Sequence, residues 1–241
     1  MKTSEYIGLT INKLPKGYIF TYSNFISEVN RKEAVIKALN RMADSGKIQK
    51  LSKGKFYKPE TSVFGNLKPT QAQVVKDLLD DDGKPTGYLT GYRIFNQLGL
   101  TTQVSNTIQI GKNEIRPAFK RELYTIAFIK QKNTITKENI PFLQLLDAIR
   151  YIKKIPDANN TSACIRLIAI LRDYKDQDKL TLVKLSLKYP PATRALLGAL
   201  LEETQNSSIT VPLRKSLNPI TVYKLPGVNN VLPNAINWNI R

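Results

Sequence analysis

The sequence has no histidine and only one cysteine, Cys164, among its 241 residues. Without histidine the chain lacks the commonest general base and cannot form a Cys–His nucleophilic pair. A single cysteine excludes a disulfide framework and is typical of proteins from a reducing compartment. Because Cys164 lies in an apolar helical run, we expect it to be a small buried side chain. The chain is therefore predicted to be cytoplasmic and to have no catalytic residues.

Long apolar runs and metal-ligand clusters are also missing. The N-terminus has no apolar stretch of signal-peptide length, and no segment reaches roughly eighteen uninterrupted apolar residues, so no contact with a membrane is predicted. Asp80, Asp81 and Asp82 have no histidine beside them to complete a metal site, and the Gly-Lys-Pro that follows is typical of a turn. We expect a solvated loop there, and neither a metal nor another cofactor.

Acidic residues are few relative to basic ones. The chain carries 37 Lys and Arg residues against 19 Asp and Glu, a formal net charge of +18 at pH 7. Residues 1–60 hold twelve of the basic and five of the acidic residues. This excess favours a polyanionic partner, either a nucleic acid or an anionic membrane surface. A generally basic surface with no such partner would give the same composition.

The first sixty residues predict three helices, a short strand and a hairpin. Apolar positions at helical spacing predict helices over 3–14, over 21–28 and from about 31 to Gly46. "GYIFT" at 17–21 predicts a strand between the first two helices, and "KIQKLSKGKFYK" predicts two strands joined by a turn. The order of these elements is that of a winged helix-turn-helix, with a recognition helix followed by a wing.

A recognition helix buries one face and offers the opposite face to the major groove of DNA. Val35, Ala38 and Leu39 form the apolar face here, so residues on the other side are the candidates for base contacts. Asn and Arg pair with adenine and guanine edges, while Lys in the first helical turn and in a flexible hairpin suits phosphates. The predicted DNA-binding residues are Arg31, Lys32, Lys37, Asn40, Arg41, Lys50, Lys53 and Lys55.

The sequence leaves two points of this assignment open: the pairing of the hairpin and the role of its charges. Ile48 and Leu51 can face the same side of the hairpin only if its first strand contains a bulge. A solvated amphipathic helix followed by a charged hairpin would also carry outward Lys and Arg residues.

Residues 61–69 are interpreted as a linker, and the larger remainder, 70–241, predicts a mixed α+β domain. Its alternating pattern predicts a strand pair that turns at Gly111-Lys112, a strand over 123–130 and a strand-like tail over 209–226. Arg194, among apolar residues at the start of a helix, is interpreted as a partly buried, paired structural arginine. The predicted helices are 70–80, 92–98, 138–154, 161–173, 179–187 and 191–205.

Several segments carry a family resemblance. "GKIQKLSKGKFYKP" after a helix resembles the wing of the DNA-binding domain of AbiE-type antitoxins, the antitoxin half of type IV toxin–antitoxin and phage-resistance systems. "GYLTGYRIFNQLGLTTQV" at 87–104 is similar to the core segment of that family. "YPPATRALLGALLEE" at 189–203 and "LRKSLNPITVYKL" at 213–225 are similar to its C-terminal stretches. The resemblance covers nearly the whole chain.

The resemblance implies a two-domain transcriptional autorepressor. Its winged helix-turn-helix over 1–60 would bind inverted repeats in double-stranded DNA upstream of its own operon. The domain over 70–241 would counter a toxin resembling a nucleotidyltransferase. Two alternatives stay open. One is a ligand-sensing winged-helix transcription factor without a toxin partner, and the other is a nucleic-acid-associated enzyme that would gather the acids of 80–82 with Glu202 and Glu203.

Overall fold

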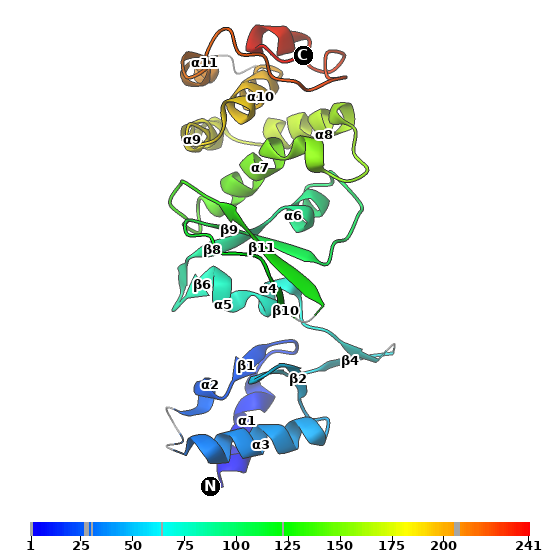
Figure 1. Ribbon diagram of the computed structural model, residues 1–241, viewed down its shortest axis with the longest axis vertical. Coiled ribbons are helices and arrows are strands. Elements are labelled where there is room, and N and C mark those ends of the chain that lie inside the picture. Colours follow the sequence, from blue (N-terminus) through cyan, green and yellow to red (C-terminus); the bar gives the residue numbers. More distant parts are fainter. Residues whose placement is uncertain (1, 27–28, 30, 64, 122, 205–207) are drawn as a thin grey trace. The chain divides into compact units, whose positions relative to one another are not determined.

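The structure is a computed structural model with helices and strands throughout, a mixed α+β fold (Figure 1). It divides into two compact units. The N-terminal unit is Met1–Asp77 with Lys120–Leu123, and the C-terminal unit is Leu78–Phe119 with Tyr124–Arg241. The residues that the structure describes are 2–26, 29, 31–63, 65–121, 123–204 and 208–241.

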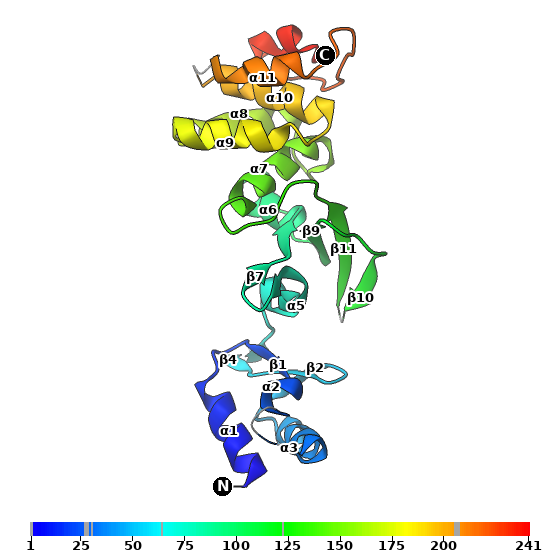
Figure 2. The same cartoon turned by 90° about the vertical axis from the view of Figure 1, so that its left-hand side faces the viewer.

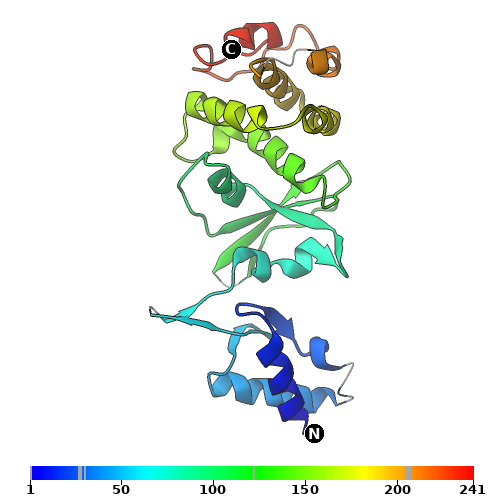
Figure 3. The ribbon, with the colours of Figure 1, turned by 180° about the vertical axis from the view of Figure 1, so that it is seen from behind.

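The N-terminal unit begins with the order of elements that the sequence predicts for its first sixty residues. These elements are α1 (Thr3–Lys13), β1 (Ile19–Thr21), α2 (Ser23–Ile26), α3 (Lys32–Asp44), β2 (Gln49–Ser52) and β3 (Lys55–Tyr57). The strands form an antiparallel sheet in the order β1-β3-β2. Helix α1 crosses α3, as Figure 3 shows from behind, and Ile7, Ile11, Leu39, Ile48 and Phe56 are buried in one core cluster.

The segment expected to be a linker contains regular structure. Strands β4 (Glu60–Ser62) and β5 (Gly65–Leu67) pair antiparallel there. The helix predicted over 70–80 is instead two short helices, α4 (Gln71–Val74) and α5 (Lys76–Leu79), because Val75 leaves the helical conformation with φ −114°.

The C-terminal unit combines a sheet with a layer of helices. Strands β8, β9 and β11 lie side by side, with β8–β9 antiparallel and β9–β11 parallel, in the sheet order β10-β11-β9-β8. Helices α6 and α7 contact the sheet, and α8, α9 and α10 pack beyond α7 (Figures 1 and 2). Strand β10 (Phe119–Arg121) begins in this unit with Phe119, and its other two residues belong to the N-terminal unit. The further elements are β6 (Asp80–Asp81), β7 (Lys84–Pro85), β8 (Gly87–Thr90), α6 (Tyr92–Gln97), β9 (Thr107–Lys112), β11 (Tyr124–Lys130), α7 (Ile140–Arg150), η1 (Ile152–Lys154), α8 (Asn160–Arg172), α9 (Asp176–Ser186), α10 (Pro191–Glu202), η2 (Ser208–Thr210), α11 (Val211–Lys215) and η3 (Pro233–Trp238).

The turn predicted at Gly111-Lys112 is wrong, since both residues continue β9. A β-carbon at Gly111 would collide with the ring of Tyr88 on the neighbouring strand β8. The glycine therefore makes room for a buried aromatic ring within a strand, which is a recognised reason for glycine in a sheet.

The strand-like tail is also predicted wrongly. The segment instead contains η2 and α11, and Tyr223 forms an isolated bridge with Ile240. The segment contains several prolines, which have no backbone N–H to donate to a neighbouring strand. Its apolar residues Leu213 and Leu225 are buried in the same cluster as the leucines of α10.

Cys164 is fully buried in α8, as predicted, and burial raises the pKa of its thiol to about 12. Among the helices of the described ranges, none combines the length and the apolar character needed to cross a lipid bilayer.

Candidate nucleic-acid interface

Helix α3 separates its apolar and polar side chains as the sequence predicts. Val35 and Leu39 are fully buried and Ala38 nearly so. Lys37, Asn40 and Arg41 are exposed on the other side of the helix, and we call these three residues the outer face of α3. None of the three has an ion pair or a side-chain hydrogen bond within the described ranges. Their polar groups are therefore available to a ligand.

Tyr22 brings the start of α3 close to the tip of the hairpin. The ammonium of Lys32 lies 5.2 Å from the centroid of the Tyr22 ring, a cation–π contact. A β-carbon at Gly54, in the hairpin turn, would lie 4.0 Å from an edge atom of the same ring. Gly54 has φ +75°, which favours glycine at this position. Arg31 is exposed directly before the helix.

The predicted bulge is present in the hairpin. Strand β2 pairs Lys50 with Phe56 and Ser52 with Lys55, so the register shifts at Leu51 between them. Ile48 and Leu51 are both buried as a result. Lys50 and Lys53 remain exposed.

Not every lysine of the hairpin projects freely. Nζ of Lys55 donates a hydrogen bond to Oδ2 of Asp77 at 3.1 Å, and only 25% of its side chain is exposed. Nζ of Lys58 donates to the carbonyl oxygens of Asn12 and Leu14 at 2.7 and 2.9 Å, which caps the C-terminal end of α1. Lys55 is thus the one predicted phosphate contact that the described residues already hold in an ion pair.

Asp77 is a residue that the sequence did not single out. Besides Lys55, it accepts hydrogen bonds from Nη1 and Nη2 of Arg121 at 2.7 and 3.0 Å, and Nη1 also donates to the carbonyl oxygen of Val74. Arg121 is 44 residues from Asp77 in the sequence, so no local pattern could have indicated the pair.

Two of the acids that the enzyme alternative would gather, Asp80 and Glu202, make hydrogen bonds within the fold. Oδ1 of Asp80 accepts a hydrogen bond from the backbone N–H of Gly83 at 2.7 Å, in the tight turn between β6 and β7. Glu202 accepts hydrogen bonds from Arg214, Asn234 and Trp238. Within the part of the chain that the structure describes, no three Cys, Asp or Glu side chains gather where they could hold a metal ion.

Comparisons with known proteins identify a family and a fold. The family described as "Family of unknown function (DUF6088)" matches residues 6–179. The fold is similar to that in the crystal structure of the RV2827C protein from Mycobacterium tuberculosis, with a TM-score of 0.58 at 11% sequence identity, over 93% of this chain and 85% of that chain. No curated protein matches the sequence.

Proposed function

The chain belongs to the DUF6088 family, and we propose that its N-terminal unit is a winged helix-turn-helix that binds double-stranded DNA. The order α1-β1-α2-α3-β2-β3 and the three-stranded sheet support this assignment. In such a domain α3 is the recognition helix and the β2–β3 hairpin is the wing. A helix of this kind enters the major groove, which admits one α-helix.

The observation that carries the proposal is the contact of Tyr22 with both the start of α3 and the wing turn. Because the Lys32 ammonium and Gly54 both lie close to the same ring, the start of α3 and the turn of the wing are near each other. Asn40 and Arg41 have the donor and acceptor groups that read base edges. Arg31, Lys50 and Lys53 suit the phosphates on either side.

The resemblance to AbiE-type antitoxins extends this proposal to a biological role. In that role the protein represses its own operon in the cytoplasm by binding inverted repeats, and it counters a nucleotidyltransferase-like toxin. The role requires binding and no catalysis. The alternative is a ligand-sensing winged-helix regulator without a toxin partner, which would show a ligand-dependent change in DNA binding.

A gel-shift titration of the full-length protein tests the DNA-binding proposal. The DNA directly upstream of its gene is compared with an unrelated fragment of equal length, at two salt concentrations. The double variant Lys37→Ala/Arg41→Ala should lose the preference for the upstream fragment. The matched control is Lys2→Ala/Lys13→Ala on α1, which removes the same charge from exposed positions of a helix that packs on the buried side of α3.

Each outcome of this titration has a definite meaning. Selective binding that disappears in the α3 variant and persists in the α1 control supports a recognition helix. Equal affinity for both fragments, unchanged in the α3 variant, would sink the proposal. The antitoxin role is tested separately, by whether co-expression restores growth of cells that express a nucleotidyltransferase-like protein encoded beside the gene.

A further inference from the structure

The C-terminal unit contains a basic cavity that the DNA-binding proposal does not use. Its volume is about 560 Å³, and it lies where β11, α7 and the connection from α9 to α10 meet. No Asp or Glu is among the described residues that line it. We propose that this cavity binds the phosphates of a nucleoside triphosphate. Its basic residues are Lys130, Lys132, Arg150, Lys188 and Arg194.

The two arginines form the inner part of the cavity wall. Arg150 and Arg194 are half-buried, whereas the three lysines are exposed at the rim. The Nε atom of Arg194 is buried and has no hydrogen-bond partner among the described residues. The sequence predicted a partly buried, paired arginine at this position. Arg194 is partly buried, but its Nε is not paired. Guanidinium groups bind phosphate oxygens through two parallel hydrogen bonds, and neither Arg150 nor Arg194 belongs to an ion pair between described residues.

The floor of the cavity is a rigid hydrogen-bonded network. Nε2 of Gln131 donates to the hydroxyl oxygens of Tyr88 and Tyr189, each at 2.8 Å. Both hydroxyls donate to the carboxylate of Asp147, at 2.8 and 3.0 Å, and Thr90 donates to it as well. Asp147 is completely buried behind this floor. The Asp147 carboxylate is therefore occupied by three hydroxyl donors, and it offers no contact to a ligand.

The size and the apolar side chains of the cavity fit a nucleotide. Ligand cavities for small molecules span roughly 300–1,000 Å³, and this one falls within that range. Leu187, Pro190 and Pro191 supply apolar surface that a base can cover. Five cations with no lining acid match the three to four negative charges of a triphosphate better than a single phosphate.

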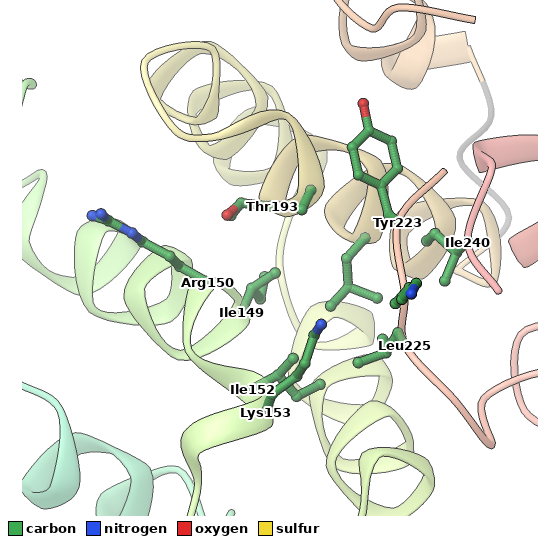
Figure 4. A pocket seen from close by; sticks show the side chains of 11 residues that line it. Ile149, Arg150, Ile152, Lys153, Thr193, Tyr223, Leu225 and Ile240 are labelled. Carbon is green, nitrogen blue, oxygen red and sulfur yellow. The ribbon is translucent and has the colours of Figure 1, made fainter. Parts of the chain in front are cut away.

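A smaller neighbouring cavity extends the basic surface but cannot hold the ligand itself. Its volume is about 50 Å³, and Arg150 lines both cavities. Figure 4 shows the guanidinium of Arg150 pointing away from the apolar side chains of Ile149, Leu225 and Ile240, which line the smaller cavity. Lys153 and Lys224 line that cavity as well, so the positive surface continues beyond the larger one.

Isothermal titration calorimetry of the full-length protein with ATP tests this proposal. We expect one ATP per chain, no binding of adenosine, and at least tenfold weaker ATP binding by Arg150→Gln/Arg194→Gln. The matched control is Arg172→Gln, an exposed arginine at the end of α8 that lines neither cavity. A second variant, Lys132→Gln/Lys188→Gln, changes only exposed rim residues, so it keeps the fold and should weaken binding severalfold.

Three results would overturn the proposal. The first is equal ATP affinity of the wild type and of both cavity variants. The second is an equal loss in the Arg172→Gln control, which would show that only net charge matters. The third is a short single-stranded DNA that binds, with loss in the cavity variants, while ATP does not, which would assign the cavity to a nucleic-acid strand. Since none of these variants touches α3, a failed gel shift and a failed ATP titration are distinguishable.

Discussion

Asp77 and Arg121 form a bidentate ion pair, in which Nη1 donates to Oδ1 at 2.7 Å and Nη2 donates to Oδ2 at 3.0 Å. Lys55 donates to the same carboxylate, so Asp77 holds a wing lysine within the N-terminal unit. Partial burial raises the pKa of Asp77, but the hydrogen bonds and charges of Arg121 and Lys55 outweigh it and lower this pKa below its ordinary value.

This lowered pKa predicts the sign of a pH effect. The pair stabilises the fold fully above the unfolded-state pKa of about 3.9, and the contribution is lost as the pH falls through the folded-state pKa. Asp77→Asn should lower the free energy of unfolding by about 1 kcal/mol or less at pH 7, because half of the Asp77 side chain is exposed. The difference from wild type, measured by urea unfolding, should shrink as the pH approaches about 3.

The control for Asp77→Asn is Glu60→Gln. Glu60 lies 3.8 Å from Lys16 and both side chains are well exposed, so its loss should be too small to measure. Equal destabilisation by the two substitutions would contradict the special role of Asp77.

The salt dependence of DNA binding separates wing lysines that reach phosphates from those that do not. If Arg31, Lys37, Lys50 and Lys53 neutralise phosphates, the slope of log affinity against log salt should be about −4. Lys53→Gln should reduce its magnitude by about 0.9. Gel shifts over a salt series measure both quantities.

Lys58→Gln is the matched control for Lys53→Gln. Its ammonium caps α1, so the salt slope should stay unchanged while the free energy of unfolding falls by about 1 kcal/mol. A lower slope in Lys58→Gln would show that the cap opens on DNA and that the assignment of the wing lysines is wrong.

Two helical glycines should respond to alanine with opposite signs. Inside a helix, alanine stabilises the helical conformation by about 1 kcal/mol relative to glycine. At Gly198, however, a β-carbon would collide with the ring of Trp238, so Gly198→Ala should destabilise the protein by about 1–3 kcal/mol. At Gly8 the nearest atoms are the flexible ends of Lys47 and Met42 at 3.4 and 3.7 Å, so Gly8→Ala should be neutral or stabilising.

Circular dichroism during thermal unfolding measures both glycine variants. A Gly198→Ala protein as stable as the wild type would mean that the Trp238 ring can shift without loss, contrary to the close packing of α10 against η3.

The stability that Asp147 contributes should depend on pH with the opposite sign to that of Asp77. Burial raises its pKa, although hydrogen bonds from Tyr88, Thr90 and Tyr189 partly counter this. The stabilisation from a group with a raised folded-state pKa is full below about pH 3.9 and is lost as the pH rises through the folded-state pKa.

Asp147→Asn should remove this pH dependence. It should also lower the free energy of unfolding by about 1–3 kcal/mol at pH 7, because an amide group cannot accept from all three hydroxyls. Urea unfolding at several pH values compares the variant with the wild type. An unchanged pH profile would mean that the folded-state pKa of Asp147 is ordinary.

The elements of the first sixty residues could be predicted from the sequence because their signals are local. The faces of α3 follow from helical spacing, and the spacing of Ile48 and Leu51 sets a bulge as the condition for one shared face, which the register shift at Leu51 meets. The partners of Lys55 and Lys58 could not be predicted, since Asp77, Asn12 and Leu14 meet them only in the folded chain. Net charge alone could not tell a capping lysine from one that is free to bind phosphate.

In the C-terminal unit the failures have tertiary causes. Glycine at position 111 suggests a turn in the sequence, but in the structure it leaves room for the ring of Tyr88 on the neighbouring strand. The tail alternates like a strand, yet its leucines pack on α10. The basic cavity joins Lys130, Arg150 and Arg194 from three separate elements, so its composition becomes visible only once these elements are in place.

Trp238 is the only tryptophan of the chain, and it is 1% exposed beside Gly198, with its Nε1 donating to Glu202. Its fluorescence therefore reports on one place, the docking of η3 on α10, while the N-terminal unit contributes only tyrosine emission. Release of this segment would carry the indole into water and shift its emission to the red. The protein thus has a built-in optical probe, through which unfolding of its C-terminal unit can be followed without a label.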